Sequence, residues 1–83
     1  MSETNLQKAC THYGRLKLLT AMATDPTQGA AYRDQAASAA GKALEGAADL
    51  GRKALVERDT PEAMITLPVV MNFLKSACPR GPS

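Results

Sequence analysis

Small residues recur at seven-residue intervals along the middle of the chain, and this pattern limits the possible folds most. Two rows follow the spacing: Ala36, Ala43 and Leu50, and Ala40, Ala47 and Ala54. On a helix the two rows are adjacent, so they form one narrow face made mostly of alanine. Because such a face lets two backbones approach closely, we expect residues 27–58 to pack against another helix in a tight antiparallel pair.

Three glycines within this segment leave two interpretations open. Gly41, Gly46 and Gly51 recur every five residues, and each weakens a helix by about 1 kcal/mol relative to alanine. The first expectation is one unbroken helix of roughly 30 residues, about 45 Å long. The alternative is a break near Gly46 or Gly51 that gives two shorter helices.

Prolines mark the expected helix starts. Asp25 is a good N-cap that would place Pro26 at the first helical position, and Thr60 and Pro61 repeat the same logic. The chain is thereby divided into helical segments at about 3–23, 27–58 and 61–77. Pro68 lies inside the third segment and either kinks that helix or restarts it after residue 67.

Composition favours helices over strands. The chain of 83 residues holds 15 Ala but one Phe, two Tyr and no Trp, which argues against a β-sandwich or barrel. We therefore predict an all-α three-helix bundle, with a long Ala-rich central helix and an apolar C-terminal helix in the centre of the core. Residues 1–78 form the domain and 79–83 a flexible tail. The length of the second helix and the apolarity of the third lead us to expect a homodimer.

Charge and cysteine usage point to the cytoplasm. Ten Lys and Arg oppose eight Asp and Glu, and they are spread along the chain rather than gathered in one run, so nucleic-acid binding is not expected. No apolar stretch reaches the roughly 18 residues of a membrane span, and the N-terminal residues do not resemble a signal peptide. Cys10 and Cys78 are expected as reduced thiols. A disulfide between them is the alternative if the first and third helices are antiparallel.

Catalytic chemistry finds little support in the sequence. Cys10 and His12 would point in different directions on a helix, and a zinc site needs four ligands, so neither a metal nor another cofactor is expected. With one histidine and no paired acidic motif, nucleophilic and acid–base catalysis lack partners. We expect a protein that is not an enzyme.

Basic side chains on the first two helices are the candidate partner-binding residues. On the first helix, three of them follow a spacing of four and three residues and form one stripe. The full candidate set is Lys8, His12 and Arg15, with Arg33, Arg52 and Lys53 on the second helix. A basic stripe of this kind suits an acidic protein surface or a phosphate backbone.

The expected function is that of a small protein-binding modulator. Its most specific form is a phage- or plasmid-encoded inhibitor of a larger bacterial defence or regulatory complex, anti-CRISPR-like in style. One alternative is a structural helical subunit that packs into an assembly through the Ala-rich face. A weaker alternative is a small nucleic-acid-binding regulator, for which binding should fall steeply with salt.

Overall fold

The computed structural model describes residues 3–79, which form three α-helices and one short 3-10 helix. Their bounds are α1 Asn5–Ala23, α2 Ala30–Glu57, η1 Glu62–Met64 and α3 Leu67–Ala77. No strand occurs between residues 3 and 79, so the all-α prediction is confirmed for this part. Of the predicted flexible tail, residues 80–83 lie outside the described residues.

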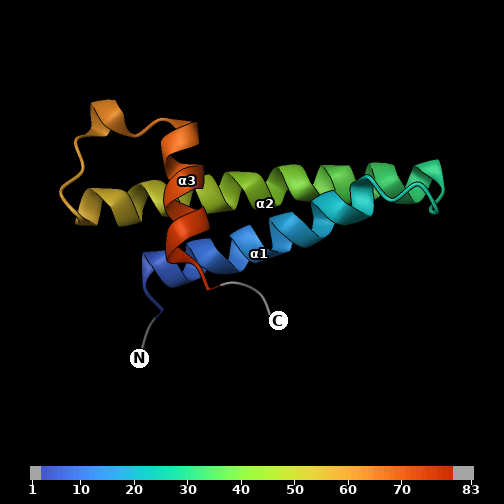
Figure 1. The fold of residues 1–83 in the computed structure, drawn as a ribbon, viewed down its shortest axis with the longest axis horizontal. Coiled ribbons are helices and arrows are strands. Elements are labelled where there is room, and N and C mark those ends of the chain that lie inside the picture. Colours follow the sequence, from blue (N-terminus) through green and yellow to red (C-terminus); the bar gives the residue numbers. More distant parts are fainter. Residues whose placement is uncertain (1–2, 80–83) are drawn as a thin grey trace.

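α1 and α2 form an antiparallel hairpin (Figure 1). The 28 residues of α2 are unbroken, so the expected single helix is confirmed and the alternative, a break near Gly46 or Gly51, does not occur. At 1.5 Å per residue α2 is about 42 Å long. It therefore extends along nearly the whole 45 Å of the molecule. The side-chain amide of Asn5, at the start of α1, donates a hydrogen bond to the carboxylate of Glu57, at the end of α2.

The Ala-rich face of α2 packs against other parts of the same chain. Its row members are either buried or partly buried: Ala36, Ala43, Ala47 and Ala54 belong to the first group, and Ala40 and Leu50 to the second. The expected tight antiparallel packing is confirmed, with α1 as the partner helix. Most of these side chains therefore pack within the chain, in the interface between α2 and α1.

The N-terminus of α2 differs from the prediction. Its N-cap is Gly29, which has no side chain to cap the helix, and Asp25 lies in the preceding turn. The Asp25 carboxylate accepts hydrogen bonds from the backbone N–H and the hydroxyl of Thr27, at 2.9 and 2.6 Å. These bonds, led by the hydroxyl, lower the pKa of Asp25 below its ordinary value of 3.8. Asp25 thus stabilises a turn two residues ahead instead of a helix.

The second predicted helix start is wrong as well, for a related reason. Asp59 has a positive φ of 62°. Its N–H donates to the carbonyl of Val56, and that of Thr60 to the carbonyl of Leu55. Thr60 is thereby part of the Schellman motif that ends α2 and does not cap a new helix.

α3 starts later than predicted, at a second threonine. The Thr66 side chain accepts from the N–H of Val69, and Pro68 lies in the first turn of the helix. A proline is tolerated there because the first-turn N–H groups have no intrahelical acceptor. Of the two roles foreseen for Pro68, the structure therefore shows the restart and not the kink.

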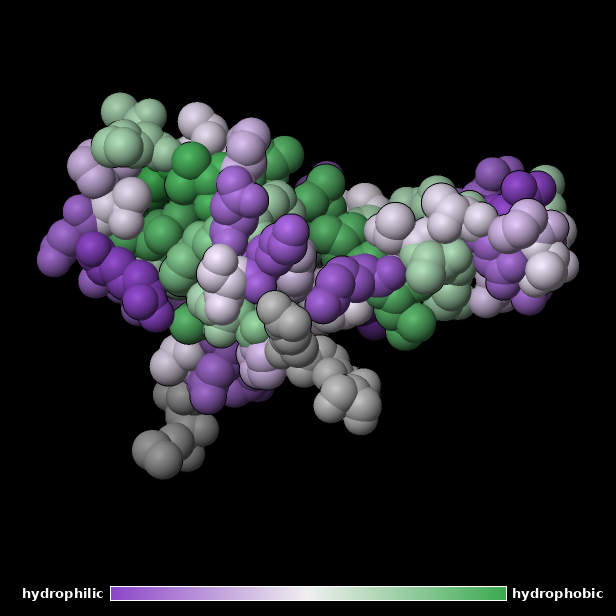
Figure 2. Space-filling view, viewed as in Figure 1, coloured by the Kyte–Doolittle hydropathy of each residue, from purple (hydrophilic) through white to green (hydrophobic). Residues whose placement is uncertain are grey.

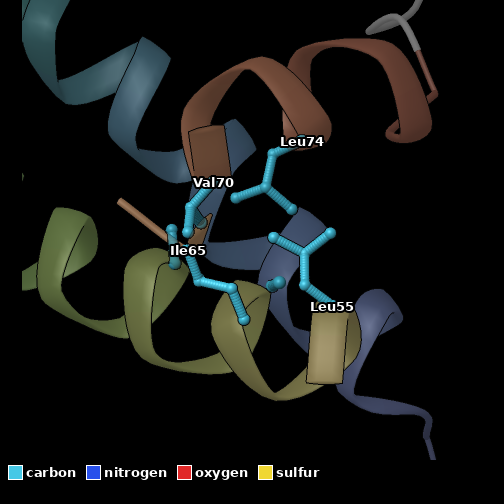
Figure 3. Packing of buried hydrophobic residues seen from close by; sticks show 6 residues of the cluster. Leu55, Ile65, Val70 and Leu74 are labelled. Carbon is cyan, nitrogen blue, oxygen red and sulfur yellow. The ribbon is translucent and has the colours of Figure 1, made fainter. Parts of the chain in front are cut away.

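The hydrophobic core lies where α3 crosses the hairpin (Figure 3). Val70 and Leu74 of α3 are fully buried, and they pack with Leu55 of α2 and with Ile65, which precedes α3. Elsewhere α3 is mostly exposed. The expectation of a central third helix is therefore wrong, since α3 lies across one side of the hairpin (Figure 1).

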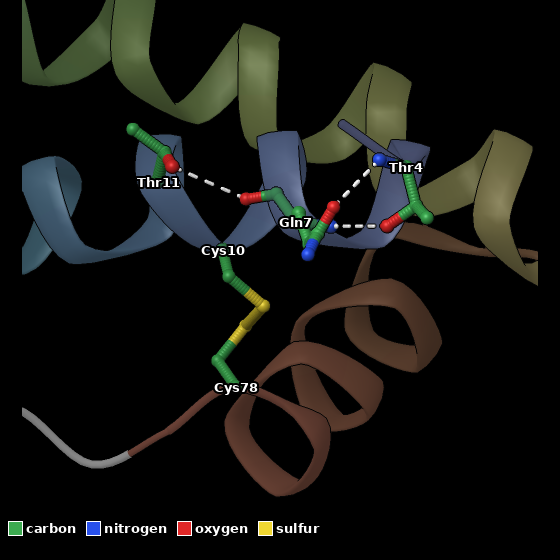
Figure 4. Close-up of a disulfide and its surroundings, with 5 residues drawn as sticks. All are labelled: Thr4, Gln7, Cys10, Thr11 and Cys78. Carbon is green, nitrogen blue, oxygen red and sulfur yellow. Dashed lines mark hydrogen bonds between the residues drawn. A yellow bond between two sulfur atoms is a disulfide. The ribbon is translucent and has the colours of Figure 1, made fainter. Parts of the chain in front are cut away.

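A disulfide joins the two ends of the fold, between Cys10 of α1 and Cys78 at the C-terminal end of α3 (Figure 4). The two Cα atoms lie 5.3 Å apart. The expectation of free thiols is wrong for this structure. The geometry also differs from the one foreseen, because α3 crosses α1 instead of running antiparallel to it (Figure 1). Nearby, Thr4 and Gln7 form a reciprocal capping box that starts α1.

Candidate functional site: a basic groove between the first two helices

A groove runs between α1 and α2, away from the hydrophobic core. Its cavity volume is about 500 Å³, within the range of small-molecule and side-chain pockets. Its basic lining residues are His12 and Arg15 of α1 and Lys42 of α2. The rest of the lining comes from α2: Gln35, Ser38, Ala39 and Ala43.

The groove exists because α2 carries small residues opposite α1. Ala39 and Ala43 line it with single methyl groups. At Gly46 there is no side chain at all, and the His12 ring occupies the space: a Cβ added there would lie 2.9 Å from Nδ1. The imidazole of His12 is therefore held against the backbone of α2 by the absence of a side chain.

The ionisable side chains that line the groove within residues 3–79 are all basic. None of its lining residues between residues 3 and 79 is acidic, and Arg15 and Lys42 contribute a guanidinium and an ammonium group. The one ion pair in the described part of the chain joins Lys53 to Asp49, at 3.4 Å. Arg15 and Lys42 thus form no ion pair with a carboxylate of the described residues. Gln35 and Ser38 add neutral hydrogen-bond donors to the same groove.

The structure brings together only part of the predicted partner-binding set. His12 and Arg15 share the groove, while Lys8 is exposed on α1 one turn earlier and does not line it. Arg33 is partly buried, and its Nε is buried without a hydrogen-bond partner.

The other two predicted residues make contacts within the chain. Arg52 donates through Nη1 to the backbone carbonyl of Ile65, at 3.0 Å, and so ties α2 to the segment before α3. Lys53 is the cation of the ion pair with Asp49. Both belong to another part of the surface than the groove.

Lys42 was missed by sequence reasoning. Its own helix gives no signal, because it stands among alanines and near Glu45. It becomes a neighbour of His12 and Arg15 only through the register of the hairpin, which the turn at residues 24–29 sets. The useful signal was the run of small residues, which marks where two helices approach closely.

Other kinds of site find no support in the described residues. Both cysteines are consumed by the disulfide, and no group of three or more His, Cys, Asp or Glu side chains between residues 3 and 79 could hold a metal ion. Within the same residues, no helix has the length and hydrophobicity that crossing a bilayer requires. Comparison with protein families, curated proteins and solved structures gives no match to this chain.

Proposed function

We propose that the protein is a non-enzymatic protein-binding module that docks on an acidic surface of a larger partner. The observation that supports this most is the groove of about 500 Å³ that Arg15 and Lys42 line from different helices, neither of them in an ion pair within residues 3–79. Lys8, exposed on α1, extends the same charge beyond the groove. In its most specific form, the proposal is a phage- or plasmid-encoded inhibitor that acts on a bacterial defence or regulatory complex.

The proposal keeps the cytoplasm as the place of action, with one requirement. Disulfides are rare in the cytosol. A cytoplasmic protein of this sequence must therefore remain folded when Cys10 and Cys78 are reduced, which urea unfolding of the reduced protein measures.

Charge reversal tests the docking surface. The double variant Lys8→Glu, Arg15→Glu is expected to lower the affinity for the partner at least about tenfold, because like charges then face an acidic surface. The readout is affinity capture from nuclease-treated bacterial lysate, quantified by mass spectrometry against wild type. Circular dichroism should show unchanged helix content, since both side chains are exposed.

Arg52→Met is the matched control for this experiment. It removes one positive charge outside the groove, together with the hydrogen bond to Ile65. We expect unchanged capture and a loss of about 1 kcal/mol in the free energy of unfolding. Equal capture by wild type and the double variant would show that the docking surface lies elsewhere.

A homodimer is the second candidate, supported by exposed hydrophobic side chains at the other end of the molecule. Four of them surround η1 and the start of α3, with exposed fractions of 39–63%: Val56, Met64, Leu67 and Val69. Figure 2 shows hydrophobic surface gathered at this end, whereas the tip of the hairpin is mostly hydrophilic on the same face. Surfaces of this kind are typical of protein interfaces.

Sedimentation equilibrium measures the mass of the protein in solution and so tests the homodimer. The expected mass is twice that of the chain, and Met64→Glu with Leu67→Glu should return it to that of the single chain. Neither side chain belongs to the buried core, so the fold should tolerate the change. A single-chain mass for the wild type at high concentration would contradict the homodimer.

A further inference from the structure

The groove between α1 and α2 is specific enough to indicate the chemistry of what it binds. We propose that it is a receptor site for a carboxylate side chain of an acidic peptide segment, held by Arg15 and Lys42 and bordered by the imidazole of His12. This inference rests on the proposed function and adds to it the chemical group that the partner contributes.

Unpaired cations are the first reason. Arg15 and Lys42 line one cavity from two helices, and neither forms an ion pair within residues 3–79. Two like charges in one groove repel each other, and an anion placed between them relieves that repulsion. A carboxylate offers two acceptor oxygens, to which the guanidinium and the ammonium groups donate strong charge-assisted hydrogen bonds.

The neutral lining is the second reason. Gln35 and Ser38 can both donate and accept hydrogen bonds, and so they suit the amide groups of a peptide backbone next to the carboxylate. Ala39 and Ala43 leave room for the apolar stem of a glutamate side chain. At about 500 Å³ the cavity admits a side chain with its flanking backbone.

The limited extent of the charge favours a peptide over a nucleic acid. Nucleic-acid binders neutralise several phosphates along a track of Lys and Arg. Here one guanidinium and one ammonium group line the groove, and the chain as a whole carries a net charge of only +2. Two cations in one groove match one carboxylate better than a phosphate backbone.

His12 has a defined position in this site because of Gly46. An added Cβ at Gly46 would lie 2.9–3.0 Å from three atoms of the imidazole ring, so Gly46→Ala must displace the ring. Gly46 is thus a positioning residue for the wall of the groove. Gly41 is its matched control, because a Cβ added there meets nothing within 4 Å.

NMR titration of the isotopically labelled protein tests the proposal. The probe is a capped peptide of alternating Glu and Ala, compared with its Gln counterpart and with inorganic phosphate. We expect saturable chemical-shift changes confined to the His12 ring and to the backbone around Arg15, Ser38 and Lys42, with the Glu peptide alone. Lys42→Ala should weaken that binding at least about tenfold, and Lys75→Ala, an exposed lysine on α3, should leave it unchanged.

Gly46→Ala tests the position of the His12 ring, which the charge-removing variant Lys42→Ala does not test. Gly46→Ala is expected to shift the His12 ring resonances in the free protein and to weaken binding of the Glu peptide severalfold. Gly41→Ala is expected to have neither effect. Equal effects of the two glycine variants would overturn the positioning role.

The carboxylate site would be contradicted if the Gln peptide bound as tightly as the Glu peptide, or if phosphate bound more tightly. It would also be contradicted if Lys75→Ala lost as much peptide affinity as Lys42→Ala, or if millimolar Glu peptide caused no chemical-shift change in the groove. The two proposals can fail separately. In one case the Glu peptide does not bind, but the Lys8→Glu, Arg15→Glu variant still loses capture of the partner. That result would support the docking surface and contradict the carboxylate site. In the other case the Glu peptide binds, but the variant captures the partner as well as wild type does, and that result would contradict the docking surface.

Discussion

Replacing both cysteines with serine is expected to lower the free energy of unfolding by about 4 kcal/mol. The bond joins residues 68 positions apart. A cross-link over that separation restricts the unfolded chain by an amount worth about 4 kcal/mol at 25 °C in the chain-entropy treatment. A domain of this size has a total stability of about 4–10 kcal/mol, so the loss is a large fraction of the whole. Urea unfolding followed by circular dichroism measures it.

Reduction of the wild type provides the control for this variant. Dithiothreitol should destabilise the wild type by a similar amount and leave the Cys10→Ser, Cys78→Ser variant unaffected. An unchanged unfolding midpoint in the double variant would show that packing of Val70 and Leu74 alone fixes α3. If the reduced protein is largely unfolded, the cytoplasmic role falls, because the bond would then have to be kept oxidised where the protein works.

The fold was predictable from the sequence wherever periodicity decided it. The two seven-residue rows on α2 predicted its close antiparallel partner, and the structure shows that partner. The continuity of α2 was the first of two interpretations, and it is also confirmed. Long, regular patterns of this kind are informative because every turn of the helix repeats the same packing requirement. The bounds of α1, Asn5–Ala23, also agree closely with the predicted helical segment at 3–23.

Helix starts were less predictable because cap residues have competing local partners. Asp25 and Thr60 are both good N-cap residues, but one stabilises its own turn and the other takes part in ending α2. Thr66 is the threonine that caps α3. The Asp25 side chain can bond to several nearby backbone groups, and the backbone N–H of Thr60 is used at the end of α2, so only the path of the chain decides which candidate caps a helix.

Only part of the candidate site was predictable from the sequence, because the rest depends on how the helices pack. His12 and Arg15 follow from spacing along one helix, which sequence shows directly. Lys42 requires the register between two helices, and the internal contacts of Arg52 and Lys53 require the tertiary structure. A charge pattern on one helix therefore identifies candidates, and the packing decides which of them converge.

Gly51→Ala and Gly41→Ala are expected to change stability in opposite directions. Both glycines lie within α2, so alanine should favour the helix by about 1 kcal/mol at either position. At Gly41 nothing lies within 4 Å of the added Cβ, and the full gain should appear. At Gly51 the added Cβ would lie 2.6 Å from Cγ1 of Val70, which is fully buried where α3 crosses α2.

The clash at Gly51 should outweigh the gain in helix propensity. Overpacking a buried contact costs about 1–3 kcal/mol, because Val70 must move into a core that has no space for it. The helix term is common to both variants, so the difference between their unfolding free energies isolates this cost. Urea unfolding of the two proteins under identical conditions measures it. Two equally stabilised variants would show that α3 is free to move away from α2, and the close crossing seen here would then be wrong.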